Sequence, residues 1–450
     1  MGSLQSTPAL GNPVARALGS PLVRGGLTLA GGVLTGNVLG FGRFALTAYL
    51  LGTHSRADSL AVAMGPIDSL NSTLINSMVF AFVPVLAAQN GPLRAEIFLK
   101  LRRLFLCVFL AVSVVVIAAA PWLMRLLAPG LTGDAFQSAV RIVQILTLST
   151  TAAGVAALYW ALLYTERRFG PTAFYQATLN LSTILVAAAL WSKFGVYSFA
   201  LGYTVGAVIQ LAAVHFAAMP TLHLRKPLHA DEDKLQWRDA LAKPGFFAVY
   251  AVLLSLNITF TRAYATHAGS GMAAALDYCM RGVGVPLAIL VSPLSTSLLP
   301  EIARLRGMLQ LREAFRLIKR TVVLTALFAM AITAVALWLR GPVIALLFQR
   351  GSFTADSTQL VAAVFLGLGP ALIGWSLIEI TGRCLFALER PWPPMIAAAA
   401  PVAVNAALTL SLHSHQPRWI GVGASTGALA GAAILLAITY GNRKRWLEER

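Results

Sequence analysis

The chain has 450 residues, of which 57% are hydrophobic and only 12% are charged. Because a water-soluble domain carries about 25% charged residues, this composition excludes a soluble globular enzyme and favours a polytopic membrane protein. The formal net charge is +18, which in a soluble protein would indicate nucleic acid binding. Here the basic residues lie in short loops between apolar runs. We therefore interpret them as signals for membrane topology and for contacts with anionic lipid headgroups, and expect no nucleic acid partner.

Twelve apolar runs are each long enough to cross a bilayer as an α-helix. We therefore expect an all-α polytopic membrane protein of about twelve transmembrane helices. In chain order the runs cover residues 27–52, 59–88, 104–124, 139–164, 171–192, 196–219, 245–267, 271–299, 321–347, 358–387, 394–412 and 419–440.

The basic residues are distributed unequally between the two sides of the predicted membrane. Of the 35 Lys and Arg residues, 24 fall in the two terminal segments and in the loops of one side, whereas 7 fall in the loops or at the ends of the spans on the other side. Because basic loops remain in the cytoplasm, we expect both termini to be cytoplasmic and the number of spans to be even. The other four lie inside predicted spans and are Arg43, Arg262, Arg281 and Arg383.

The two halves of the chain look like repeats of each other. Pro84 ends span two as Pro300 ends span eight, and Asn180 in span five corresponds to Asn405 in span eleven. Transporters built from two such six-helix, pseudo-symmetric lobes place the substrate path between the lobes. The predicted domains are a cytoplasmic tail (1–26), an N-terminal lobe (27–220), a cytoplasmic linker (221–244), a C-terminal lobe (245–440) and a basic cytoplasmic tail (441–450).

Charged side chains inside a membrane are costly and usually functional. Arg43 in span one and Asp58 at the start of span two are fifteen residues apart, and so are Arg262 and Asp277. We therefore expect each half to offer an arginine and a carboxylate to one central cavity. Asp277 and Arg281 are four residues apart and can partly neutralise each other on one helix face. The alternative is that these pairs only fix helix packing. An excess of arginines favours an anionic substrate, with phosphate the obvious candidate.

A second charged pair, Glu379 and Arg383, lies in span ten with a spacing of four residues. We interpret this pair either as a structural ion pair or as a Na⁺ or H⁺ site that would couple transport without ATP. Asn405 is a further coupling candidate and, like Asn180, is expected to form interhelical hydrogen bonds. The chain has no GxxxxGK[ST] loop and no HExxH motif, so we expect no enzymatic activity, no metal site and no cofactor.

Several short stretches match patterns that occur together in one transporter family. They are Gly36-Asn37-Val38-Leu39-Gly40-Phe41-Gly42-Arg43, Ala57-Asp58-Ser59, Ala81-Phe82-Val83-Pro84-Val85-Leu86-Ala87, Tyr278-Cys279-Met280-Arg281 and Leu347-Phe348-Gln349-Arg350-Gly351-Ser352-Phe353. Through these stretches the chain resembles the MurJ/MviN family of lipid II flippases, within the multidrug/oligosaccharidyl-lipid/polysaccharide exporter superfamily. The resemblance implies a MATE/MurJ-like fold, and it implies that Arg43 and Arg281 are cavity arginines.

The chain departs from the family pattern at three positions. Asn37 stands where the family has the arginine of S-R-V-L-G-F, and Leu70 and Asn71 stand where it has the two arginines of P-N-L-L-R-R. The family also usually carries two further spans after span twelve, which we do not expect in this chain. A divergent member that moves another lipid-linked saccharide is therefore an alternative to one that moves lipid II.

We predict a flippase of the bacterial inner membrane that moves a lipid-linked diphosphate glycan, such as lipid II, by alternating access for peptidoglycan or surface polysaccharide synthesis. The arginines would hold the phosphates, and the aspartates would orient or gate the substrate. The predicted substrate site comprises Arg43, Arg281, Asp58, Asp277, Arg262 and Asn37.

The expected partners are this lipid-linked substrate and the membrane lipids, with the protein acting as a monomer. Two alternatives remain at this point. The first is a cation-coupled exporter of drugs or metabolites from the same superfamily, for which Glu379 would be essential. The second is a non-transporting scaffold for assembly of the cell envelope.

Overall fold

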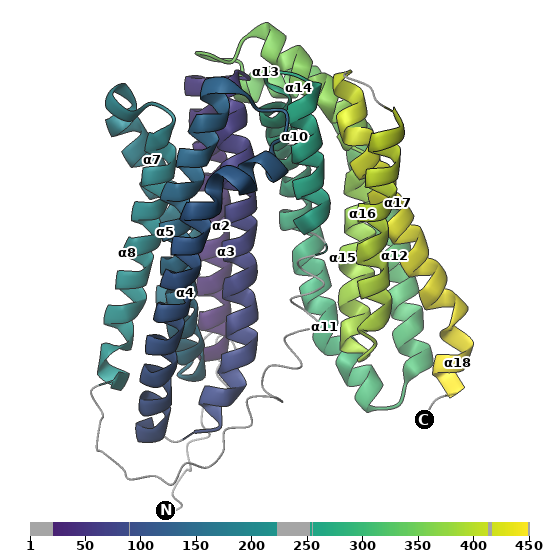
Figure 1. Ribbon diagram of the computed structural model, residues 1–450. Helices are drawn as coiled ribbons and strands as arrows, with labels where there is room; N and C mark the ends of the chain where they lie inside the picture. Colours follow the sequence, from purple (N-terminus) through teal and green to yellow (C-terminus); the bar gives the residue numbers. More distant parts are fainter. Residues whose placement is uncertain (1–20, 90, 223–252, 254, 413–415, 449–450) are drawn as a thin grey trace, which may run out of the picture.

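The structure is a computed structural model that describes residues 21–89, 91–222, 253, 255–412 and 416–448 (Figure 1). The described residues form helices and contain no β-strand. Ten helices are long and apolar enough to cross a membrane, and a bent helix pair makes an eleventh candidate. The remaining predicted span, 245–267, falls partly outside the described residues, but its part from 255 to 268 is helical. The predicted linker 221–244 lies almost entirely outside them.

The N-terminal lobe is the bundle coloured purple to blue-green in Figure 1. Each predicted span corresponds to a helix, although α4 begins well before the run 104–124, because long apolar runs can satisfy their backbone groups in lipid only as helices. The helices are α2 (Pro21–Leu51), α3 (Ser55–Ala87), α4 (Gly91–Leu127), α5 (Gly133–Thr165), the short α6 (Gly170–Ala173), α7 (Tyr175–Phe194) and α8 (Tyr197–Leu222).

The C-terminal lobe is the second bundle, coloured teal to yellow. It begins with the helical segment 255–268. The further elements are α10 (Met272–Pro286), the π-helical segment η1 (Leu287–Val291), α11 (Ser292–Gly307), α12 (Leu311–Trp338), α13 (Arg340–Phe348), α14 (Ala355–Leu368), α15 (Ala371–Ala387), α16 (Trp392–Leu412), α17 (Pro417–Gly441) and α18 (Arg443–Glu448).

Two predicted spans of this lobe have a different shape from the one expected. The run 321–347 is divided, because α12 ends at Trp338 and α13 is a separate short helix. The run 358–387 is bent by 47° between α14 and α15. The bend lies at Pro370, which has no N–H for the hydrogen bond that would continue the helix.

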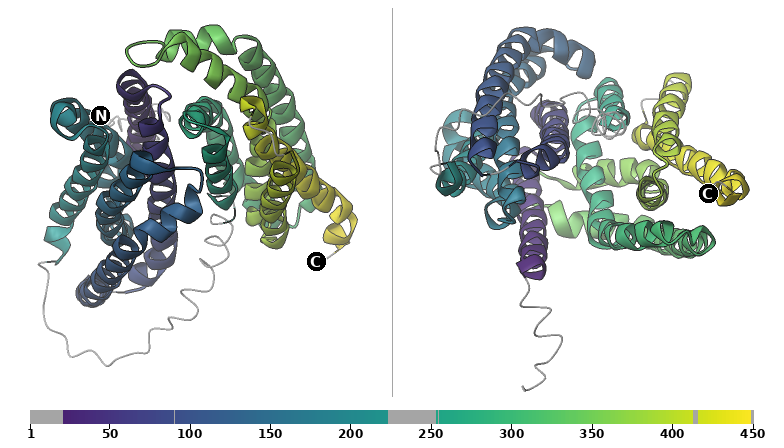
Figure 2. Two further views of the ribbon diagram at one scale, coloured as in Figure 1. Left: turned by 45° about the horizontal axis from the view of Figure 1, so that its top comes forward. Right: turned by 90° about the horizontal axis from the view of Figure 1, so that it is seen from below.

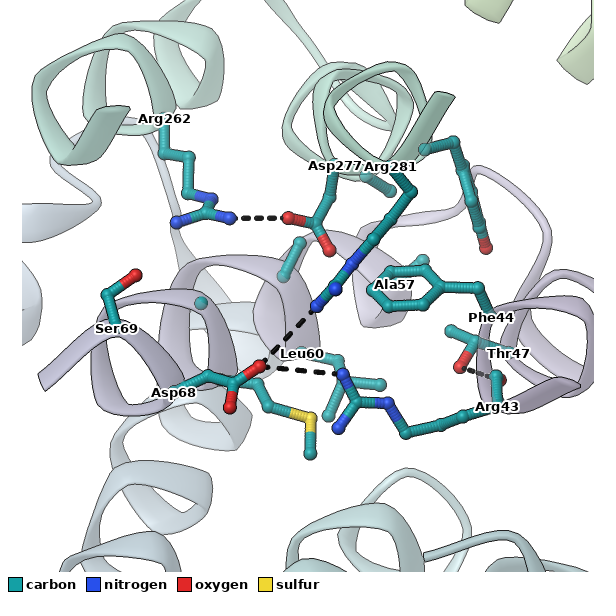
Figure 3. Close-up of a pocket in the computed structure, with 15 residues that line it drawn as sticks. Arg43, Phe44, Thr47, Ala57, Leu60, Asp68, Ser69, Arg262, Asp277 and Arg281 are labelled. Carbon is teal, nitrogen blue, oxygen red and sulfur yellow. Dashed lines mark hydrogen bonds and ion pairs between the residues drawn. The ribbon is translucent and has the colours of Figure 1, made fainter. Parts of the chain in front are cut away.

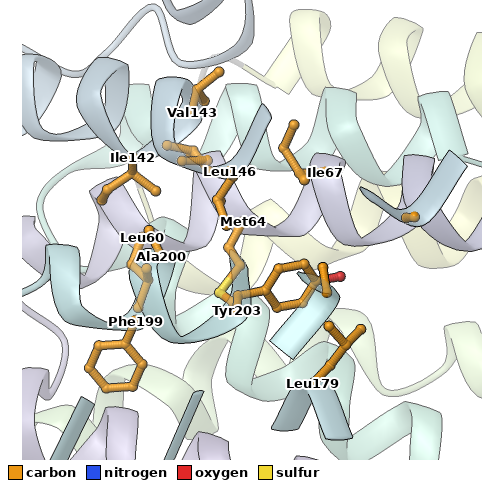
Figure 4. Packing of buried hydrophobic residues seen from close by; sticks show 14 of the residues in the cluster. Leu60, Met64, Ile67, Ile142, Val143, Leu146, Leu179, Phe199, Ala200 and Tyr203 are labelled. Atoms are coloured by element: carbon orange, nitrogen blue, oxygen red, sulfur yellow. The ribbon is translucent and has the colours of Figure 1, made fainter. Parts of the chain in front are cut away.

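Close packing holds each lobe together. Because lipid chains are as apolar as leucine, helices in a membrane associate through van der Waals contact and small residues rather than through hydrophobic burial. In the N-terminal lobe, Leu60 and Met64 of α3, Leu146 of α5 and Tyr203 of α8 belong to one buried cluster (Figure 4). In the C-terminal lobe α17 packs closely against α16, where a Cβ added at Gly427 would overlap the backbone of Pro401.

Other apolar side chains face outward. Val114 and Val115 of α4 and Phe328 of α12 are more than half exposed. Exposed apolar surface of this kind marks a contact with another apolar phase. Because α4 and α12 also meet the length and hydropathy requirements for a span, these faces are expected to contact lipid.

The two lobes touch at one end and diverge toward the other (Figures 1 and 2). At the touching end the backbone N–H of Ser352 donates to the carbonyl of Tyr49 at 2.8 Å, across the interface between α13 and α2. The hydroxyls of Thr53 and Ser357 are also hydrogen-bonded at 2.8 Å. The ends of α8, α11 and α18 lie at the diverging end.

Candidate functional site

A polar pocket of about 90 Å³ lies between the two lobes. Its lining comes from α2 and α3 of the N-terminal lobe and from the segment 255–268 and α10 of the C-terminal lobe. The charged residues that line it are Arg43, Asp68, Arg262, Asp277 and Arg281 (Figure 3).

Asp68 on α3 contacts arginines of both lobes. Its Oδ2 atom lies 3.6 Å from Nη2 of Arg43, which belongs to α2, and 3.4 Å from Nη2 of Arg281, which belongs to α10. Its Oδ1 atom accepts a hydrogen bond of 2.8 Å from the hydroxyl of Tyr203 on α8. One carboxylate therefore links the two lobes inside the pocket.

A second ion pair lies within the C-terminal lobe. Nη2 of Arg262 donates to Oδ1 of Asp277 at 2.6 Å, the short distance typical of a charge-assisted hydrogen bond. The guanidinium of Arg262 also lies against α3, where a Cβ added at Gly65 would overlap it. The absence of a side chain at Gly65 therefore makes room for Arg262 at the lobe interface.

The ring of Phe44 lies beside both arginines of the first cluster. The Cζ atom of Arg281 is 4.2 Å from the ring centroid, and that of Arg43 is 5.2 Å from it. The negative face of an aromatic ring attracts cations. Phe44 therefore helps to hold two like charges in one pocket.

The pocket has an excess of positive charge, since three arginines face two aspartates. The side chain of Arg43 is only 5% exposed, whereas that of Arg281 is 47% exposed. A pocket with an excess of one sign of charge attracts ions of the opposite sign. This arrangement can bind an anion, and Arg281 is the arginine that an incoming ligand would reach most easily.

The expected pairing of Arg43 with Asp58 is wrong. Asp58 is 1% exposed, does not line the pocket, and accepts hydrogen bonds from the backbone N–H of Gly271 (2.5 Å) and of Ala274 (2.8 Å). It thus caps the first turn of α10, whose own N-cap residue is a glycine.

Depth in the membrane explains why the two fifteen-residue spacings are not equivalent. Arg43 lies eight residues before the end of α2, about 12 Å along the axis, whereas Asp58 lies in the first turn of α3. Arg262 and Asp277 lie at similar distances from the turn between their helices, so this pair forms as expected. The two spacings are equal, but the turn between the two residues lies at a different position in each half.

Two further expectations also differ from the structure. Asp277 and Arg281 are not paired with each other, because Asp277 binds Arg262 and Arg281 reaches across to Asp68. Asn37 is exposed on α2 and does not line the pocket.

The other two positions where the family has arginines also lie outside the pocket lining. Leu70 is 46% exposed. Asn71 is buried, and its Nδ2 donates to the hydroxyl of Ser149 on α5 at 3.3 Å.

The coupling candidates lie apart from the pocket, in the C-terminal lobe. Nη2 of Arg383 is 2.6 Å from Oε1 of Glu379, and the hydroxyl of Ser295 on α11 lies 3.5 Å from the same oxygen. The i, i+4 ion pair is therefore present. Among the described residues, no group of three or more His, Cys, Asp or Glu side chains is placed to hold a metal ion.

Asn405 and Asn180 form the expected interhelical hydrogen bonds. Asn405 donates to Oδ1 of Asn257 at 2.7 Å and to Oγ1 of Thr261 at 2.8 Å, whereas Asn180 donates to the carbonyl of Gly36 at 2.9 Å. Each asparagine thus joins the fifth helix of its half to the first. This matching pair of contacts supports the repeat that the sequence indicates.

The interpretation of the sequence missed Asp68 as a site residue. A signal was present, because Asp68 is the only charged residue within the predicted span 59–88. Its partners, however, lie 25 residues before it and 213 residues after it, and no local pattern relates them.

The family model described as "Lipid II flippase MurJ" matches residues 47–448. The chain belongs to the MurJ family. It is 31% identical over 444 residues to the lipid II flippase MurJ of Burkholderia cenocepacia, an alignment that covers 91% of this chain and 82% of that relative.

The same family is found among solved structures. The structure of a lipid II flippase MurJ in an inward closed conformation superposes with a TM-score of 0.79 at 18% identity, covering 92% of this chain and 87% of that one. A multidrug resistance MATE family transporter of the MOP superfamily, in its inward-facing conformation, gives a TM-score of 0.78 at 12% identity, covering 91% and 96%. These likenesses show that the two-lobed MurJ fold is shared with the MATE transporters.

Proposed function

We propose that this protein is a lipid II flippase of the bacterial inner membrane. It would bind a lipid-linked diphosphate glycan from the cytoplasmic side and release it on the outer side for peptidoglycan synthesis. The observation that carries the proposal is that Arg43 of one lobe and Arg281 of the other converge on one point. Membership of the MurJ family, with a relative named for this activity, supports it.

The shape of the molecule fits a state open to the cytoplasm. Most basic loop residues belong to the terminal segments and to the loops at the end where the lobes diverge. The positive-inside rule assigns that end, and with it both termini, to the cytoplasm. The contacts at the other end, such as that of Tyr49 with Ser352, then close the outer side.

Alternating access follows from the division of the site between the lobes. A diphosphate group offers several acceptor oxygens, which the planar guanidinium groups of Arg43 and Arg281 can bind in a bidentate manner. Closure of the lobes at the cytoplasmic end would surround the bound head group. Separation of the outer contacts would then release it. One chain supplies both lobes, so a monomer suffices.

A cation-coupled exporter is less well supported. The fold is equally close to that of a MATE transporter, but the excess of arginines in the pocket repels cationic substrates. A non-transporting scaffold is also less well supported, because it would not need an arginine-rich pocket divided between two lobes. We retain Na⁺ or H⁺ as coupling ions, with Glu379 as the candidate carboxylate, and a membrane potential as the other possible drive for the return step.

Complementation and transport assays test the proposal. The wild-type protein should support growth of a bacterial strain depleted of its lipid II flippase and should translocate lipid II in reconstituted vesicles. Arg43→Ala and Arg281→Ala should lose both activities at normal expression. Arg56→Ala is the matched control, because Arg56 is an exposed arginine at the start of α3 that does not line the pocket.

Full activity of both pocket variants would contradict the proposed site. Failure of the well-expressed wild type in both assays would contradict lipid II as the substrate.

A further inference from the structure

The carboxylate of Asp68 stands where an anionic ligand would bind. Its Oδ2 faces Arg43 and Arg281 at 3.6 and 3.4 Å, longer than the 2.7–2.9 Å of a tight charge-assisted hydrogen bond. The pair of Arg262 with Asp277 in the same pocket reaches 2.6 Å. Asp68 therefore holds Arg43 and Arg281 less tightly than Asp277 holds Arg262. An anion that binds the two arginines more strongly can replace Asp68 as their partner.

Asp68 is held in this position from behind. Tyr203, which is 1% exposed, donates its hydroxyl hydrogen to Oδ1 of Asp68 at 2.8 Å. That bond fixes the carboxylate against the N-terminal lobe and directs the other oxygen into the pocket. When Arg281 turns to another anion, Asp68 therefore keeps its place, and it remains available to recapture the arginine after release.

We propose that Asp68 is an internal counter-anion that competes with the phosphate groups of the substrate for Arg43 and Arg281, and thereby lowers the affinity of the pocket so that the bound anion can be released. The proposal rests on the proposed function, since it concerns the same pocket. A ligand must replace the attraction of one full carboxylate charge to two arginines. That cost is the same for a monophosphate and for a diphosphate, so the competition weakens the binding of both.

The same competition connects ligand binding to the lobe interface. The ion pair of Asp68 with Arg281 joins α3 to α10, hence one lobe to the other. A bound diphosphate replaces this link by its own bridge between Arg43 and Arg281. After release the Asp68–Arg281 pair forms again, which neutralises the pocket and disfavours rebinding of the product.

Binding of two prenyl phosphates to the purified full-length protein in lipid nanodiscs tests the proposal. The probes are farnesyl diphosphate and farnesyl monophosphate, titrated by calorimetry. The wild type should bind both probes. Asp68→Asn keeps the size of the side chain and an acceptor for Tyr203 but removes the charge. It should bind both probes on the order of tenfold more tightly than the wild type does.

Two further variants separate charge from structure. Asp68→Glu retains the charge and should preserve the affinities of the wild type. Asp134→Asn, at an exposed position in the first turn of α5, should leave both affinities unchanged. Unchanged affinities in Asp68→Asn, or the same gain in Asp68→Glu, would overturn the role of Asp68.

The test of Asp68 can fail independently of the test of lipid II transport. If Arg43→Ala abolishes lipid II transport while Asp68→Asn leaves the affinity for both probes unaltered, only the counter-anion is refuted. If Asp68→Asn behaves as expected but the wild type does not transport lipid II, the anion site stands and its lipid substrate is a different one. Absence of probe binding in every variant would overturn both.

Discussion

Asp58 on α3 of the N-terminal lobe accepts a hydrogen bond of 2.5 Å from the backbone N–H of Gly271 at the start of α10 in the C-terminal lobe. Together with the bond from Ala274, this contact fixes the two lobes to each other at their touching end. Its role is structural, although the sequence placed Asp58 in the substrate site.

Asp58→Asn should destabilise the protein without weakening the anion site. An amide has one acceptor oxygen, and its NH₂ group would face a backbone donor, so at least one charge-assisted bond is lost. The expected cost is about 1.5–3 kcal/mol, measured by thermal unfolding, with an unaltered affinity for farnesyl diphosphate. Asp134→Asn serves as the control. If Asp58→Asn instead lost affinity for farnesyl diphosphate at unchanged stability, Asp58 would belong to the substrate site.

Gly65→Ala should impair transport by displacing Arg262. An added Cβ would overlap the guanidinium, and its ion pair with Asp277 would loosen. Gly31→Ala is the control, since a Cβ there meets no atom within 4 Å. In both variants alanine improves the helix propensity by up to about 1 kcal/mol, so a loss of helix propensity does not explain a difference, and equal expression of the two variants checks their folding. Equal transport by the two variants would show that the position of Arg262 is unimportant.

Asn405→Ala should cost more stability than Asn180→Ala. The amide of Asn405 donates to two side chains and accepts from Thr409, whereas that of Asn180 donates to one carbonyl. Interhelical hydrogen bonds in membranes contribute about 0.6 kcal/mol on average, so we expect about that loss for Asn180 and two to three times as much for Asn405. Unfolding in mixed detergent micelles measures both, and the reverse order would contradict the prediction.

Glu379→Gln tests the coupling site. If Glu379 binds the coupling ion, replacement of its carboxylate by the neutral amide of glutamine should abolish the stimulation of transport by a Na⁺ or H⁺ gradient. The affinity for farnesyl diphosphate should persist, because Glu379 does not line the pocket. Glu301→Gln is the matched control, since Glu301 forms a similar pair with Arg304 at 2.6 Å on the exposed surface of α11. If a Na⁺ or H⁺ gradient stimulates transport by Glu379→Gln as much as transport by the wild type, Glu379 is not the coupling site.

The sequence by itself determined the class of fold, most of the spans and the family. These properties depend on local features, namely apolar runs of sufficient length and motifs such as the one that ends in Arg43. Eleven predicted spans correspond to membrane-length helices or, for span ten, to a bent pair. Span seven is described only in part.

Arg43 and Arg281 also face one pocket, as the resemblance implied. A single charge in an apolar helix has few acceptable places, so such residues can be recognised from the sequence.

Only the tertiary structure decided which charges meet. Asp58 and Asp68 lie on the same helix, yet one caps α10 and the other binds two arginines. Their roles depend on depth below the turn, on the rotation of α3, and on the approach of α10 from 213 residues away. Spacing along the chain determines none of these, because lobe contacts depend on how twelve helices pack together. The counter-anion of the pocket is therefore a property of the assembled lobes.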